Sequence, residues 1–296
     1  LAYAVQKVRG EELNRVKEVN MITALAGKAA GVQVSKNSSG MGGSAKVSIR
    51  GVRSVAGDNQ PLYVIDGVPM LNSTSEQAYS AIGGTANAGN RDGGDGISNL
   101  NPEDVESISI LKGAPAAALY GSQAANGVIL ITTKKGNTVG RRDIHFSTGL
   151  TFEKAFSLPE MQNSYGVSDV TDSWGEKENL TVYDNLGDFF RTGLTSITSV
   201  SVNSGNDKLQ TYFSYANTTG RGILNENKLS KHNINLRETA VLFNSRLKLD
   251  GNVNVMKQTV KNKPVSGGFY MNPLVGLYRF PRGEDLAYYK DNYERY

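Results

Sequence analysis

The chain has 296 residues, no cysteine and two histidines, and its 32 basic and 28 acidic residues give a formal net charge of +4. Without cysteine it has no disulfide scaffold, thiolate metal site or cysteine nucleophile, and two histidines are too few for a multi-histidine zinc site. The charge is too balanced for a nucleic-acid footprint, and no run approaches the ~18 apolar residues of a membrane helix. We therefore expect no metal, no cofactor and no nucleic-acid partner.

Glycine is unevenly distributed, because 19 of the 33 glycines lie between Gly27 and Gly140. Glycine permits turns and close backbone approach, so this part should be compact and turn-rich. A helix is predicted over residues 11–29, where apolar residues recur at helical spacing before Gly31. Short strands are predicted at residues 31–35, 46–50, 61–66, 107–112 and 128–134.

Two short helices complete this first part. Asn101 can cap a helix that begins at Pro102, and an alanine-rich helix over residues 114–120 should end at Gly121. Between the strands, residues 71–99 are rich in Gly, Asn, Ser, Thr and Asp. A loop of that length in a compact domain is functional or disordered. We predict an α+β domain over residues 1–140.

The second part of the chain has a period of two. The clearest case follows Arg246, where every second residue is apolar or small: Leu247, Leu249, Gly251, Val253 and Val255. Residues 143–154 and 208–215 alternate in the same way, and residues 195–204 and 232–237 do so more weakly. Such alternation predicts strands with one apolar and one polar face.

The connections between these strands alternate in length. Residues 155–193, 219–231 and the stretch from 261 onward are long or medium links, whereas 205–207 and 240–244 are short. Outer-membrane barrels show this pattern, with strands of ~9–11 residues, short periplasmic turns and long external loops. A soluble β-sandwich also has alternating antiparallel strands, so periodicity alone leaves both architectures open.

A family resemblance rests on ordered blocks in the first part of the chain. They are LAGKAAGV at 25–32, IRG at 49–51, PLYVIDGVP at 61–69, NPEDVESI at 101–108, LKGA at 111–114, ALYGS at 118–122 and AANGVILITTKKG at 124–136. In their order and number these blocks resemble the plug domain of the SusC/RagA family of TonB-dependent outer-membrane transporters. The second part is similar at DFFRTG, residues 188–193, and through its strand pattern.

The resemblance implies an α+β plug domain followed by the N-terminal part of a large antiparallel transmembrane β-barrel, with 22 strands in the full protein. It implies a location in the outer membrane of a Gram-negative bacterium. Residues 141–296 would supply about five barrel strands, fewer than the ~8 of the smallest membrane barrels. The chain, which begins at Leu1 and ends at Tyr296, is therefore expected to be a piece of a longer protein.

The function implied by the resemblance is import of a bulky oligosaccharide or peptide, with energy from TonB, by displacement of the plug and without covalent chemistry. The implied partners are TonB, through a segment upstream of Leu1, a SusD-like surface lipoprotein lid, the substrate, and membrane lipid or lipopolysaccharide. Gln123 stands where many family members carry a basic residue, without clear consequence.

The plug blocks supply candidate structural or gating residues: Arg50, Gly51, Asp66, Gly67, Asn101, Pro102, Tyr120, Gly121, Asn126 and Gly127. Arg50 is either an exposed charge at a strand end or the partner of a carboxylate on the barrel wall. Such polar contacts would suit a plug that must be displaced reversibly. Asp66 and Gly67 are interpreted as a turn after a strand, the interpretation that we favour, or as part of a switch under TonB force.

A second set of candidates could contact the substrate or the lid: Asn87, Asn90, Arg91, Trp174, Tyr270, Tyr288 and Tyr289. The amides and hydroxyls of residues 71–99 suit sugar hydroxyls or peptide amides. Tyrosine and tryptophan have a flat apolar face and a polar tip, which suit sugar stacking, a lid interface or a membrane-interface girdle. Alternatively, residues 71–99 are a mobile linker without such contacts, and the aromatic residues pack within ordinary loops.

No catalytic constellation is found in the sequence. Residues 40–43 lack the spacing of a dinucleotide fingerprint, and there is no Gly-x-Ser-x-Gly elbow. His145 lies on the polar face of a predicted wall strand, where a satisfied wall residue is the simpler interpretation. The sequence therefore predicts no enzyme. Two alternatives stay open: a siderophore or cobalamin receptor, which the SusC-like blocks disfavour, and a β-rich surface glycan-binding or adhesion protein.

Overall fold

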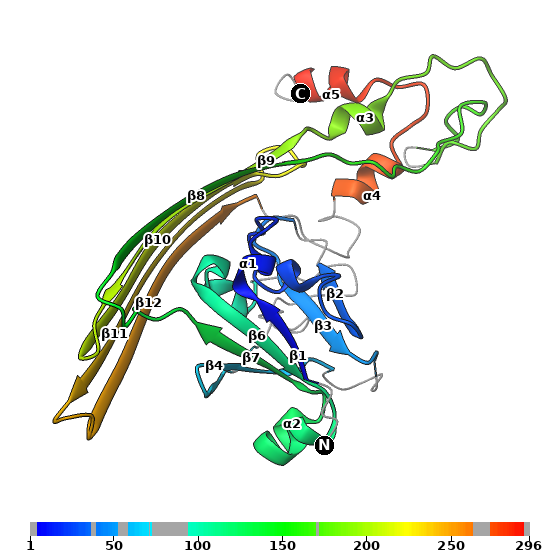
Figure 1. Cartoon of the computed structure of the whole chain (residues 1–296). Helices are drawn as coiled ribbons and strands as arrows, with labels where there is room; N and C mark the ends of the chain where they lie inside the picture. Colours follow the sequence, from blue (N-terminus) through cyan, green and yellow to red (C-terminus); the bar gives the residue numbers. More distant parts are fainter. Residues whose placement is uncertain are drawn as a thin grey trace, which may run out of the picture.

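The computed structural model describes residues 5–36, 40–52, 59–70, 72, 94–169, 172–262 and 273–292 (Figure 1). An N-terminal α+β domain lies against the concave face of a curved antiparallel sheet, and a small helical assembly lies beyond one end of that sheet (Figure 1). The α+β domain followed by long antiparallel strands confirms the predicted order of fold types.

The N-terminal domain contains a five-stranded sheet in the order β1-β6-β7-β4-β5, in which only the β4–β7 pair is parallel. Its strands are β1 (Val5–Arg9), β4 (Leu62–Ile65), β5 (Val68–Met70), β6 (Val105–Leu111) and β7 (Val128–Thr133). A separate antiparallel pair joins β2 (Val32–Lys36) to β3 (Ala45–Ile49). The five predicted strands are confirmed, whereas β1 and β5 were not predicted.

The predicted helix over residues 11–29 is wrong. Only α1 (Gly10–Leu13) and the 3-10 helix η1 (Thr23–Leu25) form there. The Asn20 side chain accepts a hydrogen bond from the Ile22 backbone N–H at 2.9 Å, and such local bonds compete with helix formation. Most apolar residues of the segment still face inward, because Leu13, Met21, Ile22 and Leu25 are fully buried, whereas Val16 is exposed.

The short helices follow their predicted chemistry. Asn101 caps the 3-10 helix η3 (Pro102–Asp104), and its side chain accepts a hydrogen bond from the Glu103 backbone at 3.2 Å. Helix α2 (Ala114–Tyr120) ends at Gly121, whose φ is +64°. Two further 3-10 helices are η2 (Gly96–Asn99) and η4 (Gly121–Ala124).

The second sheet is an antiparallel meander of five strands in the order β8-β9-β10-β11-β12. The strands are β8 (Arg142–Glu153), β9 (Gly193–Gly205), β10 (Leu209–Arg221), β11 (Lys228–Leu242) and β12 (Leu247–Lys261). They have 12 to 15 residues, longer than predicted. The connections alternate in length as predicted: residues 206–208 and 243–246 are short turns, whereas 154–192 is a long link.

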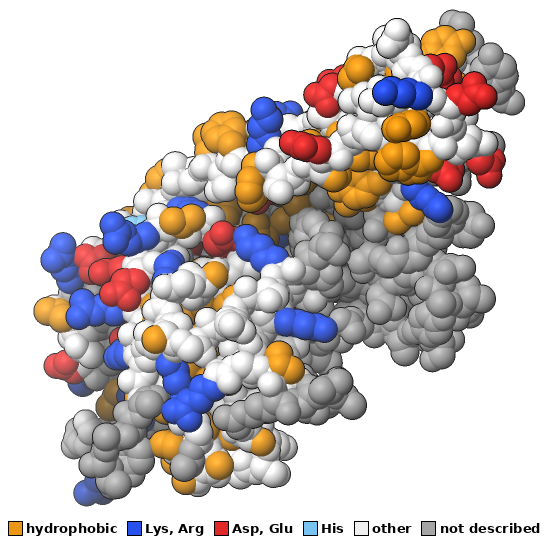
Figure 2. Space-filling model, turned by 90° about the vertical axis from the view of Figure 1, so that its right-hand side faces the viewer, with side chains coloured by type: hydrophobic (Ala, Val, Ile, Leu, Met, Phe, Trp, Pro, Cys, Tyr) orange, Lys and Arg blue, Asp and Glu red, His pale blue; other side chains and the backbone are white. Residues whose placement is uncertain are grey.

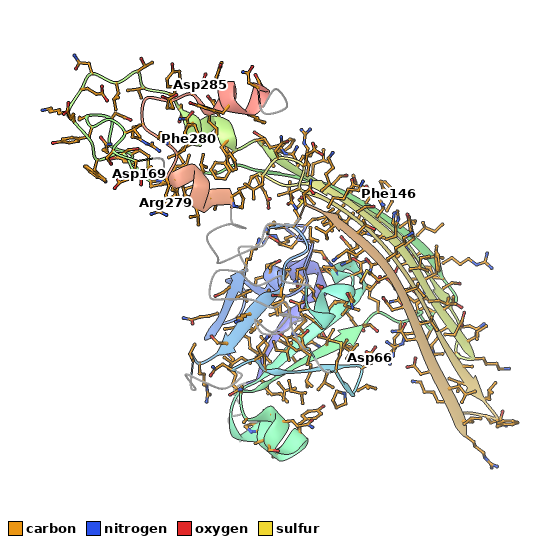
Figure 3. The ribbon with its side chains drawn as sticks, turned by 180° about the vertical axis from the view of Figure 1, so that it is seen from behind. Asp66, Phe146, Asp169, Arg279, Phe280 and Asp285 are labelled. Atoms are coloured by element: carbon orange, nitrogen blue, oxygen red, sulfur yellow. The ribbon has the colours of Figure 1, made fainter. Side chains whose placement is uncertain are left out.

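The two faces of this sheet differ in chemistry. Its convex face exposes apolar side chains, among them Ile144 at 74%, Phe146 at 66% and Val253 at 61%, and Phe146 points away from the N-terminal domain (Figure 3). Its concave face carries polar residues, many of which the N-terminal domain buries. This arrangement confirms the amphipathic strands that the period of two predicts.

The helical assembly lies at the end of the sheet that carries the long connections. It comprises α3 (Asn185–Phe189), α4 (Pro273–Tyr278) and α5 (Leu286–Asn292) with the long β8–β9 link. The Asn185 side chain joins them, because it donates to the Glu284 carbonyl at 2.8 Å and accepts from the Leu286 N–H at 2.9 Å. Among the described residues, no helix has both the length and the hydropathy to cross a membrane.

Candidate functional site

The contact between the N-terminal domain and the concave face is centred on β11. In the middle of this strand every second residue faces inward, is polar and is almost completely buried: Lys231, Asn233, Asn235, Arg237 and Thr239. Buried polar groups need hydrogen-bond partners. For Lys231, Asn233 and Arg237, the N-terminal domain supplies those partners.

Arg237 forms the densest group of contacts. Its Nη1 donates to Asp66 Oδ2 at 2.9 Å and to Thr133 Oγ1 at 2.5 Å in the N-terminal domain. Its Nε and Nη2 donate to the two carboxylate oxygens of Asp250 on β12, at 2.8 and 2.9 Å. Lys135 also pairs with Asp250, at 3.3 Å. We call Asp66, Thr133, Lys135, Arg237 and Asp250 the Arg237 network.

The turn after β4 holds Asp66 in place for this contact. Asp66 has φ +48° and Gly67 has φ +90°, values that favour glycine and, more weakly, aspartate. The Asp66 carboxylate accepts hydrogen bonds from the backbone N–H and hydroxyl of Thr133 at 3.0 and 2.6 Å. Asp66 is thus a turn residue, the interpretation that we favoured, and its side chain faces the sheet (Figure 3). A switch under TonB force stays a prediction.

A second contact lies further along β11. Lys231 Nζ donates to the Ser98 carbonyl at 2.6 Å, and Asn233 Nδ2 donates to the Asn99 carbonyl at 2.8 Å. These carbonyls belong to η2, whose N-terminal cap is Asp95. The Asp95 carboxylate accepts from the backbone N–H groups of Ser98 and Ala45, each at 2.8 Å. Asp95, which the sequence placed in a polar loop, therefore shapes the surface that β11 binds.

Asp104 makes a third contact of different chemistry. It is fully buried, and its Oδ1 accepts a hydrogen bond from the Tyr212 hydroxyl of β10 at 3.0 Å. Burial raises the pKa of the Asp104 carboxyl, while hydrogen bonds from neighbouring side chains and the charge of Lys134 act in the opposite direction. No arginine or lysine pairs directly with Asp104 among the described salt bridges, unlike Asp66.

At the β8 edge the domain and the sheet make a more open contact. Lys17 Nζ bonds both Glu103 and the Ser147 hydroxyl of β8. Beside it lies a cavity of about 790 Å³, lined by charged side chains of β1 and α1 and by His145. His145 is on the inner face of β8, as predicted, and is exposed within that cavity.

The predicted pairing of Arg50 with a wall carboxylate is not supported by its described surroundings. Arg50 has φ +63°, its N–H donates to the Gly31 carbonyl at 2.8 Å, and its guanidinium lies beside Gly113. All of these partners belong to the N-terminal domain. Among the described residues, two other ion pairs join the domain to the sheet: Asp66 of the domain pairs with Arg237, and Lys135 pairs with Asp250.

The other predicted plug residues shape the inside of the domain. Gly127 is tightly packed, because a Cβ there would lie 2.9 Å from Ile49 Cδ1 and 3.0 Å from the Leu111 carbonyl. Asn126 donates to the Gln60 carbonyl at 3.4 Å, and Tyr120 packs on a small apolar cluster around Ala116. A positive-φ turn holds Gly51. The start of η3 holds Asn101 and Pro102, and the end of α2 holds Gly121. Their gating role stays a prediction.

The predicted substrate or lid contacts are only partly described. Asn87, Asn90, Arg91 and Tyr270 lie outside the described residues. Trp174 is 67% exposed and lines a cavity of about 500 Å³ with Tyr278, Arg279 and Arg282. Tyr288 and Tyr289 instead pack edge to face on α5, with ring centroids 5.6 Å apart. Hydrophobic side chains gather with charged ones in this outer part of the molecule (Figure 2).

Sequence reasoning missed Arg237, Asp250, Lys231 and Asn233. The sequence signal for them is their position in the alternating pattern, which marks one face of each strand as polar. A position on the polar face does not identify the residue that it contacts. The contacts with Asp66 and with η2 are therefore seen only in the structure.

Comparison with known proteins identifies the family. The model of the TonB-dependent Receptor Plug Domain matches residues 1–128. The TonB-dependent receptor SusC of Bacteroides thetaiotaomicron is 31% identical over 279 residues, which cover 90% of this chain and 25% of SusC. The chain thus spans about a quarter of this curated relative.

Solved structures share the fold. A structure of the RagAB peptide transporter matches with a TM-score of 0.71 at 24% identity, over 97% of this chain and 34% of that one. The siderophore receptor PirA from Acinetobacter baumannii matches less well, with a TM-score of 0.55 at 19% identity, over 94% of this chain and 35% of that one.

These findings agree with one another over most of the chain. TonB-dependent receptors are outer-membrane proteins of Gram-negative bacteria, and they are transporters rather than enzymes. The N-terminal domain matches their plug, the sequence of nearly the whole chain is similar to SusC, and its fold is similar to RagAB. The chain belongs to the SusC/RagA family of TonB-dependent receptors.

Proposed function

We propose that this chain is part of an outer-membrane importer in which TonB displaces the plug to admit a bulky nutrient. In this proposal residues 1–140 form the plug and residues 141–296 form the first strands of the barrel wall. The boundary is supported by the connection between β7 and β8, which end at Thr133 and begin at Arg142. The apolar convex face would contact membrane lipid and lipopolysaccharide.

The observation that carries the proposal is the polar character of the contact between plug and wall. The Arg237 network and the contacts of Lys231 and Asn233 join the two parts through hydrogen bonds and ion pairs. Because water can replace such bonds, their net contribution is modest, about 0.5–1.5 kcal/mol for a neutral hydrogen bond and about 1.5–3 kcal/mol for one to a charged group. An interface of this kind can be broken and remade during transport.

The partners follow from the family and remain part of the proposal. TonB would act on a segment upstream of the plug, and a SusD-like lipoprotein would cover the outer loops. The family resemblance implies an oligosaccharide or a peptide as substrate, and the RagAB peptide transporter is a structure with the same fold. A siderophore or cobalamin receptor is a weaker candidate, because PirA matches less closely than RagAB.

The experiment is to tether the plug to the wall in the full-length transporter. This part of the chain has no cysteine, so thiols introduced by Asn99→Cys and Asn233→Cys can be joined with a short bismaleimide. The native side chain of Asn233 reaches the Asn99 backbone. The cross-link should abolish TonB-dependent uptake while substrate still binds at the outer surface.

A matched control places both thiols within the plug. Gln33 and Ser48 are paired neighbours on β2 and β3, so a cross-link between Gln33→Cys and Ser48→Cys should leave uptake intact. Normal uptake by the transporter cross-linked between positions 99 and 233 would refute displacement of the plug from this part of the wall.

A further inference from the structure

Four cations and a histidine gather on one surface of the wall, near the end that carries the long connections. In the outermost row, Arg221 of β10, Lys228 of β11 and Lys261 of β12 are direct cross-strand partners. Two rows further inward, His232 of β11 is the partner of Lys257 of β12. Directly opposed residues lie on the same face of a sheet. We call these five residues the outer basic cluster.

The outer basic cluster lies on the convex face, which carries Phe146 and turns away from the plug (Figure 3). On β11 the odd-numbered residues Lys231 and Arg237 contact the plug, whereas Lys228 and His232 occupy even-numbered positions and lie on the opposite face. The four cations are exposed, and His232 is half-buried. This surface therefore faces whatever surrounds the wall.

The placement of these cations is unfavourable without an anion, because like charges directly opposite each other on neighbouring strands repel. Strands β8 to β12 are described in full, and on their convex face the single carboxylate is Glu238, six residues inward of His232.

One carboxylate outside the strands reaches the outer basic cluster. Glu226, in the turn between β10 and β11, accepts a hydrogen bond from Lys228 Nζ at 2.7 Å. The pKa of the Glu226 carboxyl is lowered chiefly by the hydrogen bond and charge of Lys228, and further by the charges of Arg191 and Lys261. One carboxylate against the four cations leaves an excess of positive charge.

The outer basic cluster extends further from the apolar band than a phospholipid headgroup does. Ile234 and Val255 are the outermost apolar pair of β11 and β12, and Lys261 lies six residues beyond Val255. Six residues span about 20 Å along a strand, which is a height of about 15 Å for a strand tilted by ~35–45°. The headgroup region of a phospholipid leaflet is only about 5–8 Å thick. An anionic saccharide reaches far enough to meet both basic rows.

Hydroxyl groups lie between the two basic rows. Thr219, Ser230 and Thr259 are cross-strand partners there, and hydroxyls can bond both sugar hydroxyls and phosphate oxygens. On β8 and β9 the outermost row carries Phe152 and Leu194 instead of cations. The outer basic cluster is therefore confined to β10, β11 and β12, as a site rather than a uniform belt.

The hydrogen bonds of His232 fix its role in the inner basic row. Its Nδ1 lies 3.2 Å from Asn217 Nδ2 and 2.9 Å from the Tyr215 hydroxyl. Because an amide NH2 group only donates, Nδ1 accepts and the proton of the neutral ring lies on Nε2. An N–H donor beside the ammonium group of Lys257 is suited to a phosphate oxygen.

We propose that the outer basic cluster binds the phosphorylated saccharide headgroup of lipopolysaccharide. One phosphate binds at His232 and Lys257, and a further anionic group of the saccharide binds at Arg221, Lys228 and Lys261. This inference rests on the proposed function, which places residues 141–296 in the barrel wall, and it adds a defined site to the membrane contact. The acyl chains lie along the apolar band, and the bound anions offset the repulsion between opposed cations.

The test measures lipid binding by the full-length transporter, purified in a non-ionic detergent. The probes are lipopolysaccharide with its core saccharide, the same lipopolysaccharide dephosphorylated with hydrofluoric acid, phosphatidylglycerol and inorganic phosphate. Intact lipopolysaccharide should bind, and removal of its phosphates should weaken binding about tenfold or more. Phosphatidylglycerol and inorganic phosphate should not displace it. Higher ionic strength should weaken binding, because salt screens exposed charges.

Charge variants locate the site. Lys228→Gln, Lys257→Gln and Lys261→Gln together should weaken binding of lipopolysaccharide about tenfold or more, because each lysine near an anionic surface contributes to the attraction. The same three positions changed to arginine should retain binding. Glu226→Gln removes the carboxylate that competes for Lys228, so it should strengthen binding about twofold or more.

A matched control removes three exposed cations from the opposite end of the same sheet. Arg142 begins β8, and Lys208 and Arg246 lie in the two short turns. Arg142→Gln, Lys208→Gln and Arg246→Gln together change the net charge by the same amount and should leave lipopolysaccharide binding unchanged. Heat-modifiable migration in gels verifies that the barrel of each variant is assembled.

Different results would overturn different proposals. Equal binding of intact and dephosphorylated lipopolysaccharide, or equal losses in the two triple variants, would overturn the site. Displacement of lipopolysaccharide by phosphatidylglycerol would overturn the preference for a saccharide headgroup. These outcomes leave the import function standing, because it is tested by uptake after cross-linking of positions 99 and 233. Normal uptake by that cross-linked transporter would overturn displacement of the plug and leave the lipid site standing.

Discussion

The inside of the plug and its contact with the wall are built from opposite kinds of side chain. The plug core contains fully buried aliphatic residues such as Leu25, Ile108 and Ile129. The contact with the wall buries Lys231, Asn233 and Arg237 instead. Apolar burial keeps the plug folded, whereas polar contacts exchange readily with water. The difference fits the proposed displacement, in which the plug would leave the wall without unfolding.

The largest predicted effect is in the plug core. Ile129 is fully buried on β7, so Ile129→Ala should lower the free energy of plug unfolding by about 3–4 kcal/mol through lost burial and an unfilled cavity. Amide hydrogen exchange of β6 and β7 in the full-length transporter measures this change. Unchanged protection of both strands would show that the wall, rather than the plug core, keeps these strands folded.

Arg237→Ala should loosen the plug by about 2–3 kcal/mol, because it leaves Asp66 and Asp250 without their shared guanidinium. The cost is below that of a fully buried pair, since both carboxylates retain some exposure and Lys135 still faces Asp250. Hydrogen exchange should rise at the end of β7 and in the linker that follows, while the core of β7 stays protected.

Lys228→Ala is the control for Arg237→Ala. Lys228 lies on the same strand and forms an exposed ion pair with Glu226 at 2.7 Å. Exposed pairs contribute about 0–1 kcal/mol, so plug docking should be unaffected. If the two variants behave alike, the Arg237 network does not hold the plug.

A smaller effect is expected from Lys231→Met, which keeps the apolar stem and removes the donor to the Ser98 carbonyl. The loss should be about 1–2 kcal/mol, seen as faster exchange of the η2 amides. Lys257→Met on β12, where the lysine is exposed, should not change that exchange. Equal effects of the two variants would contradict a role of Lys231 in docking.

The wall was predictable from sequence because one physical constraint acts along its whole length. An apolar convex face and a polar concave face force the side chains to alternate, which is visible in residues 143–154 and 246–255. The strands proved longer than predicted, since polar residues at their ends, such as Lys228 and Lys261, continue the hydrogen-bond ladder without the alternation.

The plug was less predictable, because its structure depends on tertiary contacts. Most apolar residues at helical spacing in residues 11–29 face the core, yet the segment turns at Asn14 and Asn20, whose side chains bond backbone groups. Strand β5, with only three residues, carries too short a pattern to detect. The partners of Asp66 lie more than sixty residues away along the chain, at Thr133 and Arg237, and single-sequence patterns do not report such pairs.

The smallest predicted effect concerns Asp104, the buried plug carboxyl that faces a tyrosine rather than a cation. Burial raises the pKa of this carboxyl above the ordinary aspartate value of 3.8, so the docked plug holds the proton more tightly than a displaced plug exposed to water. The contribution of Asp104 to docking should therefore be fully present below the ordinary value and should be lost as the pH rises through the raised pKa.

Asp104→Asn should remove this pH dependence, because the amide stays neutral while its oxygen can still accept from Tyr212. Above the raised pKa the variant should dock at least as tightly as the parent, as measured by hydrogen exchange of η3 across a pH series. Looser docking of the variant at neutral pH would mean that the ionised carboxylate is the docked form. In that case both carboxylates would hold the plug by their charge, and the contrast between Asp66 and Asp104 would disappear.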